Sequence, residues 1–421
     1  MSRALSIGAL ADVVEPGDLV YLPGGVTTPV PFIEELQREI GRSRGLRVLT
    51  SIAPGIDNPL DLDRLDETAV VTGLFMQPSL TQAQRTGRYR ALPVSYGGFV
   101  RQLRESEAID LVVVQVTPPD AAGRCSLGPS VEFTPLALHK ARRVLALVNS
   151  DLPRFSNSVD IPFDRFDHVC DVGGALPVYQ TNDDAPTRAI ADHIAALVKD
   201  GGTLQMGLGK VPTALAAALR GHRRLRLFSG MLSDGLMNLS EAGALDSDFM
   251  HTCCVAAGSL ALYQWADKFE RLRIAGCETT HDARTLGALE GFIAVNSALE
   301  VDLFGQCNLE HADGRAVSGA GGAPDFARAA RLSPGGCSIV ALNASYSSRK
   351  RGLVSRIVPR LPDPGVASLS RVDIDCIITE FGTAELRGAS VHERAEAIIA
   401  VAAPECRDDL QRAWSGIAAQ L

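Results

Sequence analysis

The sequence predicts an α/β protein made of two similar open α/β halves that face one another across a cleft. Short β-branched runs alternate with amphipathic helical stretches, a pattern that indicates α/β units with a largely parallel sheet. In the first half, the expected strands are residues 18–22, 46–50, 69–72, 111–116 and 144–149. In the second half, they are residues 203–207, 226–229, 292–296, 338–342 and 374–380.

A domain boundary is expected near residue 180. Residues 178–187 are polar and carry a helix-start signal, and the α/β pattern begins again after them with an expected helix at 188–199. The sequence therefore predicts an N-terminal domain at 1–180 and a C-terminal domain at 181–421. Ligands of open α/β sheets usually bind outside the carboxyl ends of the strands, and the glycine-rich loops described below follow such ends.

Composition indicates a globular protein rather than a membrane protein. The chain has 421 residues, of which 46% are hydrophobic and 21% charged, enough for a large core. Its longest apolar runs are far shorter than the roughly 20 residues needed to span a bilayer. The N-terminus lacks the apolar segment of a secretory signal, so a cytoplasmic location and no membrane partner are expected.

Charge and cysteine usage exclude other classes. A net charge of −8 argues against a general nucleic-acid surface, although loops and helix ends can still bind a phosphate group. The nine cysteines form no Cys-x-x-Cys pair, so neither a disulfide framework nor a metal site is predicted. We expect reduced cysteines that are mostly buried, and no permanently bound cofactor. The adjacent Cys253 and Cys254 leave a redox-active pair open as an alternative.

The sharpest local pattern is QMGLGKVPTAL at residues 205–215, where a strand runs through two glycines into a helix expected near Pro212. Glycines let backbone N–H groups approach an anion, and the helix adds its positive end. The segment lacks the third glycine of a dinucleotide fingerprint and the Gly-Lys-Ser/Thr of a phosphate loop, so nucleotide-triphosphate binding is not predicted. A plain strand-to-helix turn is the alternative.

A second glycine cluster, SGAGGAPDF, spans residues 318–326. Its backbone donors could face a thioester oxygen or a phosphate, and a pair of tight turns is the alternative. Residues 117–128 form a third candidate loop after an expected strand, and this loop too could be only a turn.

Together these segments resemble the acetyl-CoA hydrolase/transferase family, which belongs to the family I CoA-transferases. The resemblance is to acetyl-CoA hydrolases, succinyl-CoA:acetate transferases and 4-hydroxybutyrate CoA-transferases, and it runs from about residue 8 to residue 413. The segments that carry it are TPPD at 117–120, SLG at 126–128, DGGTLQMGLG at 200–209, VNSALEVDLFGQ at 295–306, GAGGAPDF at 319–326, SRIVP at 355–359 and TEFGTAELRG at 379–388.

The resemblance implies two domains of the NagB/RpiA/CoA-transferase-like fold, a homodimer, and a role in acyl-CoA or acetate metabolism. It implies an enzyme whose substrates are a small acyl-CoA and a small carboxylate. Carried over by position, the CoA-binding segment falls on Gly207, Leu208, Gly209, Lys210 and Val211. The loop that approaches the thioester and pantetheine carries over onto Gly319, Gly321 and Gly322.

The chain departs from the family at the nucleophile. Family members use a glutamate that becomes acylated and then carries CoA as a glutamyl thioester. They place it in a Ser-Glu-Met segment followed by Ser-Asp-Gly, whereas residues 228–236 here read FSGMLSDGL. The resemblance therefore assigns the nucleophile position to Gly230, which has no carboxylate.

Two nearby acids and one histidine farther along the chain are weighed as replacements. Asp234 and Glu241 correspond to positions that accompany the glutamate in ordinary members, which favours structural roles. His281 is a candidate general base for water, and a packed histidine is the alternative.

Three functional hypotheses follow. The first, which we favour, is a CoA-transferase in which the acceptor acid attacks the bound thioester directly, without a glutamyl-CoA intermediate. The second is an acyl-CoA thioesterase, in which water replaces the acceptor. The third is a non-catalytic protein that binds acyl-CoA or serves as a scaffold.

Overall fold

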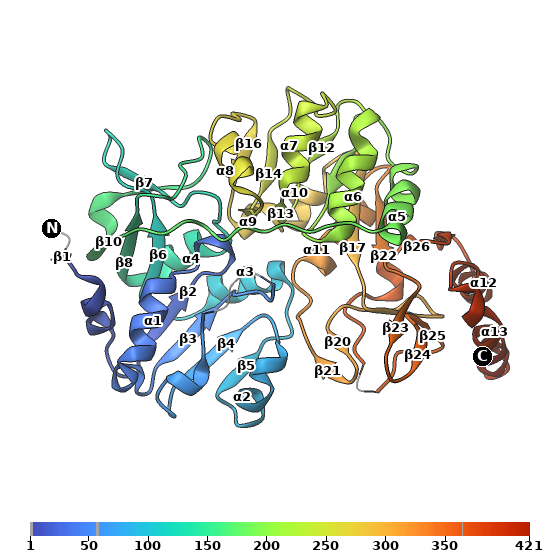
Figure 1. Cartoon of the computed structure of the whole chain (residues 1–421), viewed down its shortest axis with the longest axis horizontal. Coiled ribbons are helices and arrows are strands. Elements are labelled where there is room, and N and C mark those ends of the chain that lie inside the picture. The colour runs from blue at the N-terminus through green and yellow to red at the C-terminus, as the bar shows by residue number, and fades with distance from the viewer. Residues whose placement is uncertain (1–2, 56–58, 364) are drawn as a thin grey trace. The chain divides into compact units, whose positions relative to one another are not determined.

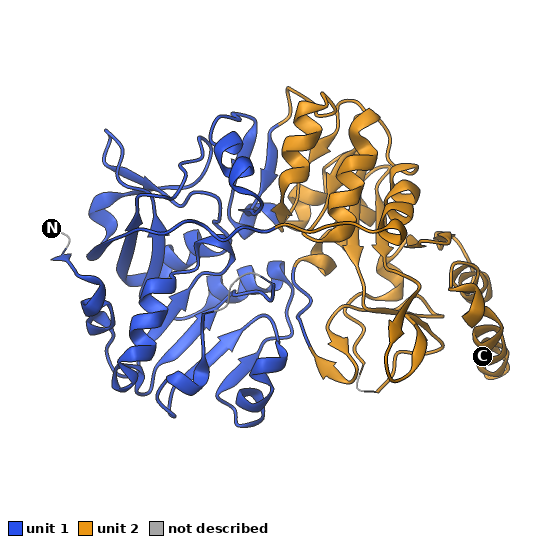
Figure 2. Cartoon of the chain, viewed as in Figure 1, with its two compact units in different colours: residues 1–179, 250–280, 317–321 blue, residues 180–249, 281–316, 322–421 orange. Residues whose placement is uncertain are grey.

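The computed structural model describes residues 3–55, 59–363 and 365–421. The chain divides into two compact units, coloured separately in Figure 2. Unit 1 contains Met1–Tyr179, Met250–Thr280 and Val317–Gly321, and unit 2 contains Gln180–Phe249, His281–Ala316 and Gly322–Leu421. The chain first passes from unit 1 to unit 2 next to residue 180, where the sequence predicts a domain boundary. Two later segments return to unit 1, so a single boundary does not describe the division into units.

Unit 1 is built on a parallel sheet. Within the described residues, eight strands form it in the order β1-β10-β8-β6-β2-β3-β4-β5, and every neighbouring pair is parallel (Figure 1). The strands are β1 Arg3–Ala4, β2 Leu19–Leu22, β3 Arg47–Thr50, β4 Val70–Gly73, β5 Tyr89–Ala91, β6 Ile109–Val116, β8 Ala141–Asn149 and β10 His168–Val172. β6 and β8 are nearly continuous buried apolar runs, as expected for central strands covered on both faces.

Helices and small strand pairs complete unit 1. The helices are α1 Val30–Arg38, α2 Thr81–Arg85, α3 Tyr96–Glu105, α4 Thr134–Lys140, α8 Leu260–Ala266 and α9 Cys277–Thr280. The smaller strands are β7 Arg124–Ser126, β9 Asp160–Pro162, β14 His251–Cys253, β15 Val255–Ala256 and β16 Leu272–Ile274. β7 pairs with β9, and β14 pairs with β16.

Unit 2 has its own sheet. In the part of the chain that the structure describes, six strands take the order β12-β11-β17-β22-β26-β27, all parallel except β27, which is antiparallel to β26. The strands are β11 Thr203–Gln205, β12 Arg226–Leu227, β17 Phe292–Ser297, β22 Cys337–Ala341, β26 Cys376–Thr379 and β27 Gly382–Glu385. The carboxyl ends of the five parallel strands therefore share one edge of the sheet, and their amino ends share the other.

The helices of unit 2 are α5 Ala185–Ala195, α6 Lys210–Ala218, α7 Asp234–Glu241, α10 Ala283–Gly287, α11 Ala323–Leu332, α12 Val391–Ala400 and α13 Pro404–Ala418. The remaining strands are β13 Met231–Leu232, β18 Glu300–Asp302, β19 Cys307–Asn308, β20 His311–Ala312, β21 Arg315–Ala316, β23 Ser345–Ser348, β24 Gly352–Ser355 and β25 Ile357–Val358. No helix among the described residues is both long and apolar enough to cross a bilayer.

The predicted α/β class and strand positions are confirmed, with local shifts at element ends. The expected strands 203–207 and 226–229 end two residues early, at Gln205 and Leu227, because the chain turns there. The helix expected at 188–199 begins instead at Ala185, since the Asp184 carboxylate caps it by accepting a hydrogen bond from the Thr187 N–H at 3.0 Å.

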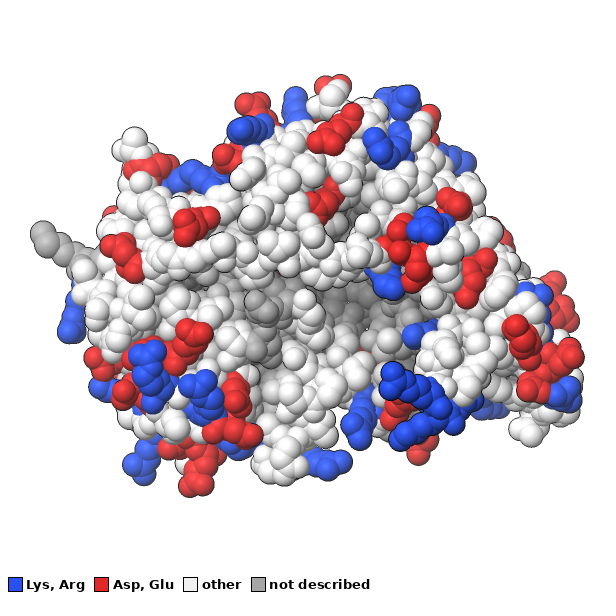
Figure 3. Space-filling view, viewed as in Figure 1, with Lys and Arg blue, Asp and Glu red and all other residues white. Residues whose placement is uncertain are grey.

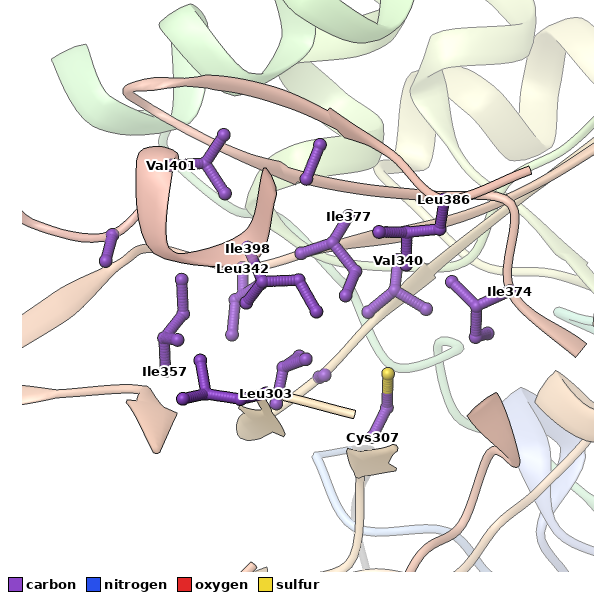
Figure 4. Packing of buried hydrophobic residues seen from close by; sticks show 14 of the residues in the cluster. Leu303, Cys307, Val340, Leu342, Ile357, Ile374, Ile377, Leu386, Ile398 and Val401 are labelled. Atoms are coloured by element: carbon purple, nitrogen blue, oxygen red, sulfur yellow. The ribbon is translucent and has the colours of Figure 1, made fainter. Parts of the chain in front are cut away.

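One apolar cluster joins the sheet of unit 2 to its C-terminal helices. Figure 4 shows Ile377 of β26 and Val340 of β22 packed among side chains such as Leu303 and Ile398 of α12. Trp414 of α13 belongs to the same cluster and is 4% exposed. The cluster fixes both C-terminal helices against the sheet through burial of apolar surface.

We predict that Ile377→Ala lowers the free energy of unfolding by about 2–5 kcal/mol, because it leaves a cavity in this cluster. Tryptophan fluorescence during urea unfolding measures the change, and Trp265→Phe in all proteins compared leaves Trp414 as the reporter inside the cluster. The matched control is Leu332→Ala at a side chain that is 71% exposed, where a change within about 0.5 kcal/mol is expected. Equal effects of the two substitutions would contradict this description of the core.

Candidate functional site

The candidate CoA loop follows the carboxyl end of β11. Gly207, Leu208 and Gly209 are partly exposed, and α6 begins at Lys210 with Gly209 as its N-cap at φ 126°. Only glycine adopts that backbone conformation readily, so Gly209 is required by the turn itself. Lys210 is an exposed cation whose Nζ lies 2.8 Å from Oδ2 of Asp184, and Val211 is partly buried in the first turn of the helix.

A buried hydroxyl ties this loop to the segment that carries Gly230. The side chain of Ser229 is fully buried, and its Oγ hydrogen-bonds the backbone carbonyl of Met206, the residue before Gly207. The same Oγ lies 2.9 Å from the carbonyl oxygen of Met231. The bond therefore holds the residue before Gly207 next to the residue before Gly230. It also occupies the Ser229 hydroxyl, which argues against that serine as a nucleophile.

Gly230 lies against His281. A Cβ atom built on Gly230 would be 3.2 Å from Nε2 of His281 and 3.4 Å from the Phe326 ring. A Cβ on Gly322 would be only 2.4 Å from the same Nε2, so a side chain at that position is excluded. The imidazole thus fills the space between the two glycines, and it packs on Phe326 at a centroid distance of 4.7 Å. The fold brings three residues singled out from the sequence into one cluster.

Burial determines the protonation state of His281. The side chain is 4% exposed, and desolvation lowers its pKa to about 3, so the imidazole is neutral near pH 7. A group with so low a pKa is a weak general base at neutral pH. A neutral imidazole can still donate a hydrogen bond to a developing negative charge, which suits an oxyanion-stabilising group better than the base expected from the sequence.

The two acidic candidates lie at opposite ends of α7. Asp234 is the first residue of this helix and is partly buried, close in sequence to Gly230. Glu241 is the last residue of the helix and is exposed. The helix therefore separates the two residues by almost two turns, and only Asp234 is close in sequence to Gly230.

The second glycine cluster divides between the units. Gly319 and Gly321 belong to unit 1, where a Cβ on Gly319 would be 2.1 Å from the Leu74 carbonyl oxygen and Gly321 adopts φ 56°. Gly322 belongs to unit 2 and is the N-cap of α11. Close backbone packing and turn geometry thus explain Gly319 and Gly321 without a ligand, while Gly322 shares the cluster of His281.

A buried carboxyl in unit 1 was missed by the sequence analysis. Glu132 is 3% exposed, and its φ of 43° is rare for a residue with a side chain. The Ser51 hydroxyl donates to its Oε2 at 2.7 Å, and Tyr96 also hydrogen-bonds the carboxyl. Desolvation raises the pKa of Glu132 to about 7 despite these bonds. The positive φ and the burial of Glu132 are set by tertiary structure, so no local sequence pattern predicts this site.

The cysteines are free thiols, as expected. Seven of the nine are buried, all of them within described residues. Burial, followed by neighbouring Cys254, raises the pKa of Cys277 well above its usual range, which disfavours a reactive thiolate. The Sγ atoms of Cys337 and Cys376 lie 3.7 Å apart on adjacent strands, a contact between thiols rather than a disulfide bond.

Comparison with known proteins gives matches across both units. A family model for the acetyl-CoA hydrolase/transferase N-terminal domain matches residues 89–172, and the corresponding C-terminal domain matches residues 258–414. The chain belongs to the acetyl-CoA hydrolase/transferase family.

Full-length similarities agree with this membership. The chain is 28% identical over 405 residues to the 4-hydroxybutyrate coenzyme A transferase of Clostridium kluyveri, covering 94% of each protein. It is 29% identical over 414 residues to a succinyl-CoA:cyclohexane-1-carboxylate CoA transferase of Geobacter metallireducens, covering 96% of this chain and 93% of that protein. The solved 4-hydroxybutyrate CoA-transferase of Porphyromonas gingivalis superimposes with a TM-score of 0.79 and 26% identity, covering 100% of this chain and 98% of that one. The family and fold resemblances drawn from the sequence are confirmed.

We predict that Glu132 makes this family member less stable as the pH rises. A carboxyl whose pKa is raised from about 4.5 to about 7 binds its proton more tightly in the folded state, so its contribution of about 3 kcal/mol is present below pH 4.5 and is lost by about pH 7. Glu132→Gln removes the titration, and the free energy of unfolding of the variant relative to wild type should rise over this window.

Urea unfolding at pH 4.5, 6 and 7.5 measures the difference. Glu34→Gln, at an exposed position of α1, is the control and should follow the wild-type profile. Parallel profiles for wild type and Glu132→Gln would contradict the assignment of a buried, titrating carboxyl.

Proposed function

We propose that this protein is an acyl-CoA:carboxylate CoA-transferase that acts on a small acyl-CoA without a glutamyl-CoA intermediate. Membership of the acetyl-CoA hydrolase/transferase family supports the class of substrate, and the two relatives described above are CoA transferases by name. The observation that carries the mechanism is the placement of His281 against Gly230, in the space where a side chain at that position would lie.

The proposed reaction has two balanced steps. The acceptor carboxylate oxygen attacks the thioester carbonyl carbon, the C–S bond breaks, and a mixed anhydride and CoA thiolate form. The thiolate then attacks the acceptor carbonyl carbon of the anhydride, which releases the donor acid as a carboxylate and gives the new thioester. No proton is consumed overall, so a strong base is not required, in keeping with the low pKa of His281.

We assign His281 to oxyanion stabilisation in both steps. Each attack places negative charge on a carbonyl oxygen, and a neutral, desolvated donor stabilises such charge without reorganisation of solvent. Because Gly230 and Gly322 have no side chains, we propose that the carbonyl group of the bound thioester or anhydride can reach the imidazole. In this proposal Asp234 at the start of α7 keeps a structural role.

The carboxyl edge of the unit 2 sheet also offers cations for the phosphates of CoA. Lys210 lies there, and the hairpin β23–β24 follows the carboxyl end of β22 with Arg349, Lys350 and Arg351 exposed at its turn. Figure 3 shows Lys and Arg side chains gathered over this part of unit 2. Local positive charge of this kind supports binding of an anionic ligand by a chain whose net charge is −8.

We predict that Gly207→Val weakens binding of acetyl-CoA at least tenfold, which corresponds to about 1.4 kcal/mol. A Cβ on Gly207 would meet no heavy atom within 4 Å, so the side chain would occupy the space proposed for the ligand without disturbing the fold. Gly209 is unsuitable for this test, because a side chain there would strain the backbone at φ 126°.

Calorimetric titration measures the affinity, with Gly221→Val as the control at an equally open glycine in the turn after α6. Unchanged affinity in Gly207→Val would remove the loop assignment. Absence of binding by the wild type would remove the proposed function.

We predict that transfer proceeds through a ternary complex. With acetyl-CoA and a panel of carboxylic acids, initial-rate lines should intersect, and borohydride should leave the protein mass unchanged because no glutamyl thioester forms. With an acceptor labelled with ¹⁸O in its carboxylate, one label should appear in the released acetate. Parallel lines with a covalent adduct would overturn direct transfer, and release of CoA at the same rate without an acceptor would indicate a thioesterase.

Gly230→Glu is the informative variant for the same prediction. The φ of Gly230 lies outside the left-handed region, so a side chain is not excluded by the backbone, but its Cβ requires His281 to move by a few tenths of an ångström. Suppose that the variant folds, binds acetyl-CoA and forms a borohydride-sensitive covalent adduct at residue 230. The other groups needed for glutamyl-thioester chemistry would then be present in this protein. We also propose a homodimer, as the family resemblance implies, which light scattering of the purified protein tests. A cytoplasmic location is proposed from the N-terminal sequence, which lacks the apolar segment of a secretory signal.

A further inference from the structure

A cavity in unit 2, separate from the candidate site described above, is lined by arginines. It has a volume of about 330 Å³, and its lining includes Phe304, Arg331, Arg371, Arg387, Gly388 and Arg394. Ile374 and Leu386, both labelled in Figure 4, form part of its apolar wall. We call it the arginine cavity. Its volume lies in the range of small-molecule sites, roughly 300–1,000 Å³.

The arginine cavity lies at the opposite edge of the sheet from the candidate CoA loop. Ile374 and Asp375 precede β26, so they lie at its amino end. Because β27 is antiparallel to β26 and pairs Glu385 with Cys376, Arg387 lies at the same edge. Gly207 follows the carboxyl end of β11, which is parallel to β26 through β17 and β22. The cavity is therefore not part of the site proposed above.

Positive charge in the cavity exceeds its negative charge. Among the described lining residues there are four guanidinium groups and one carboxylate, that of Asp375. Asp375 is 2% exposed and is shared by Arg387, at 3.0 Å, and Arg331, at 3.7 Å. In the part of the chain that the structure describes, neither Arg371 nor Arg394 forms an ion pair with a carboxylate.

Arg371 and Arg394 are held in place by contacts other than ion pairs. Arg394 donates to the backbone carbonyls of Arg371, at 2.8 Å, and Ile374, at 3.2 Å. The guanidinium carbon of Arg371 lies 5.9 Å from the centroid of the Phe304 ring, which packs edge-on against Trp414. Such contacts order the guanidinium groups before any ligand arrives, which reduces the entropy lost on binding.

The crowding of like charge has an electrostatic consequence. Desolvation, followed by the charges of Arg331 and Arg371, lowers the pKa of Arg394. Repulsion among these groups destabilises the empty cavity, and a bound anion would relieve it. The start of α12 is nearby, but its capping box already uses the N–H groups of Ser390 and Glu393, so the arginines are the main donors for an anion.

We propose that the arginine cavity binds a small phosphorylated anion with two or more negative charges, at a site separate from the candidate active site. Guanidinium forks match the oxygens of phosphate groups and bind them through paired hydrogen bonds. Several guanidiniums around one cavity favour a diphosphate or a nucleoside diphosphate over a monocarboxylate. The partly apolar wall and the Phe304 ring offer a surface for an attached organic group.

The test uses the full chain with pyrophosphate, ADP and adenosine as probes. Arg331→Gln/Arg371→Gln removes the two guanidiniums that are least engaged in the fold and leaves Arg387 and Arg394 intact. Arg223→Gln, at an exposed loop position, is the matched control. Thermal unfolding checks that all three proteins are folded, and calorimetry at low ionic strength measures the binding.

We expect the wild type and Arg223→Gln to bind pyrophosphate or ADP with one site, and the double variant to bind at least tenfold more weakly. Binding should weaken as salt rises, since charge provides it. Equal affinities for pyrophosphate and ADP assign the site to the phosphates alone, and tighter ADP binding assigns it to a nucleotide. No binding by the wild type, equal binding by the double variant, or binding of adenosine as tight as that of ADP would overturn the proposal. Loss of acetyl-CoA binding in the double variant would also overturn it, because the cavity would then belong to the CoA site.

Discussion

Parallel pairing of β11, β17, β22 and β26 is the constraint on which the chemistry of unit 2 depends. Parallel strands send all their carboxyl ends to one edge, so the loops that follow them meet there even though they are distant in sequence. The Ser229 hydroxyl then fixes two of these loops to each other by its bond to the Met206 carbonyl. The same pairing sends every amino end to the other edge, where a different set of side chains gathers. One sheet thus presents two chemically distinct edges.

The absence of side chains is as important to the candidate site as their presence. His281 can occupy its position only because Gly322 has no Cβ, and a Cβ on Gly230 would also lie closer to the imidazole than an ordinary van der Waals contact allows. The imidazole is then removed from water and kept neutral. Under the proposal that Gly230 replaces a covalent nucleophile, its position next to a neutral, desolvated donor is consistent with electrostatic rather than covalent catalysis.

Sequence reasoning worked where structure is decided locally. The β-branched runs located the ends of the expected strands to within three residues, and the glycines between Gln205 and Lys210 marked a real strand-to-helix turn. It failed where residues far apart in the chain meet. Gly319 and Gly322 look like one motif, but the chain passes from unit 1 to unit 2 between them.

The positions of charged groups in the fold and their pKa values were equally hard to predict from composition. The arginines at 331, 371, 387 and 394 form no motif in the sequence. The end of α11, the segment before β26 and the antiparallel return of β27 bring them around one cavity. The pKa of Glu132 depends on burial that no run of residues encodes. Motifs therefore located the backbone features of the candidate site, whereas its electrostatics required coordinates.

The interleaving of the two units has a consequence for biosynthesis. The backbone N–H of Cys277 donates to the carbonyl oxygen of Glu132 at 2.8 Å, so unit 1 includes a contact whose second partner is translated long after the first. The backbone N–H of Tyr96 likewise donates a hydrogen bond to the carbonyl oxygen of Gly321, at 3.0 Å. A ribosome must release the chain as far as residue 321 before unit 1 can close, by which time much of unit 2 has also emerged. Folding of the two units is thus expected to overlap in time during translation, and neither can be excised as a continuous fragment.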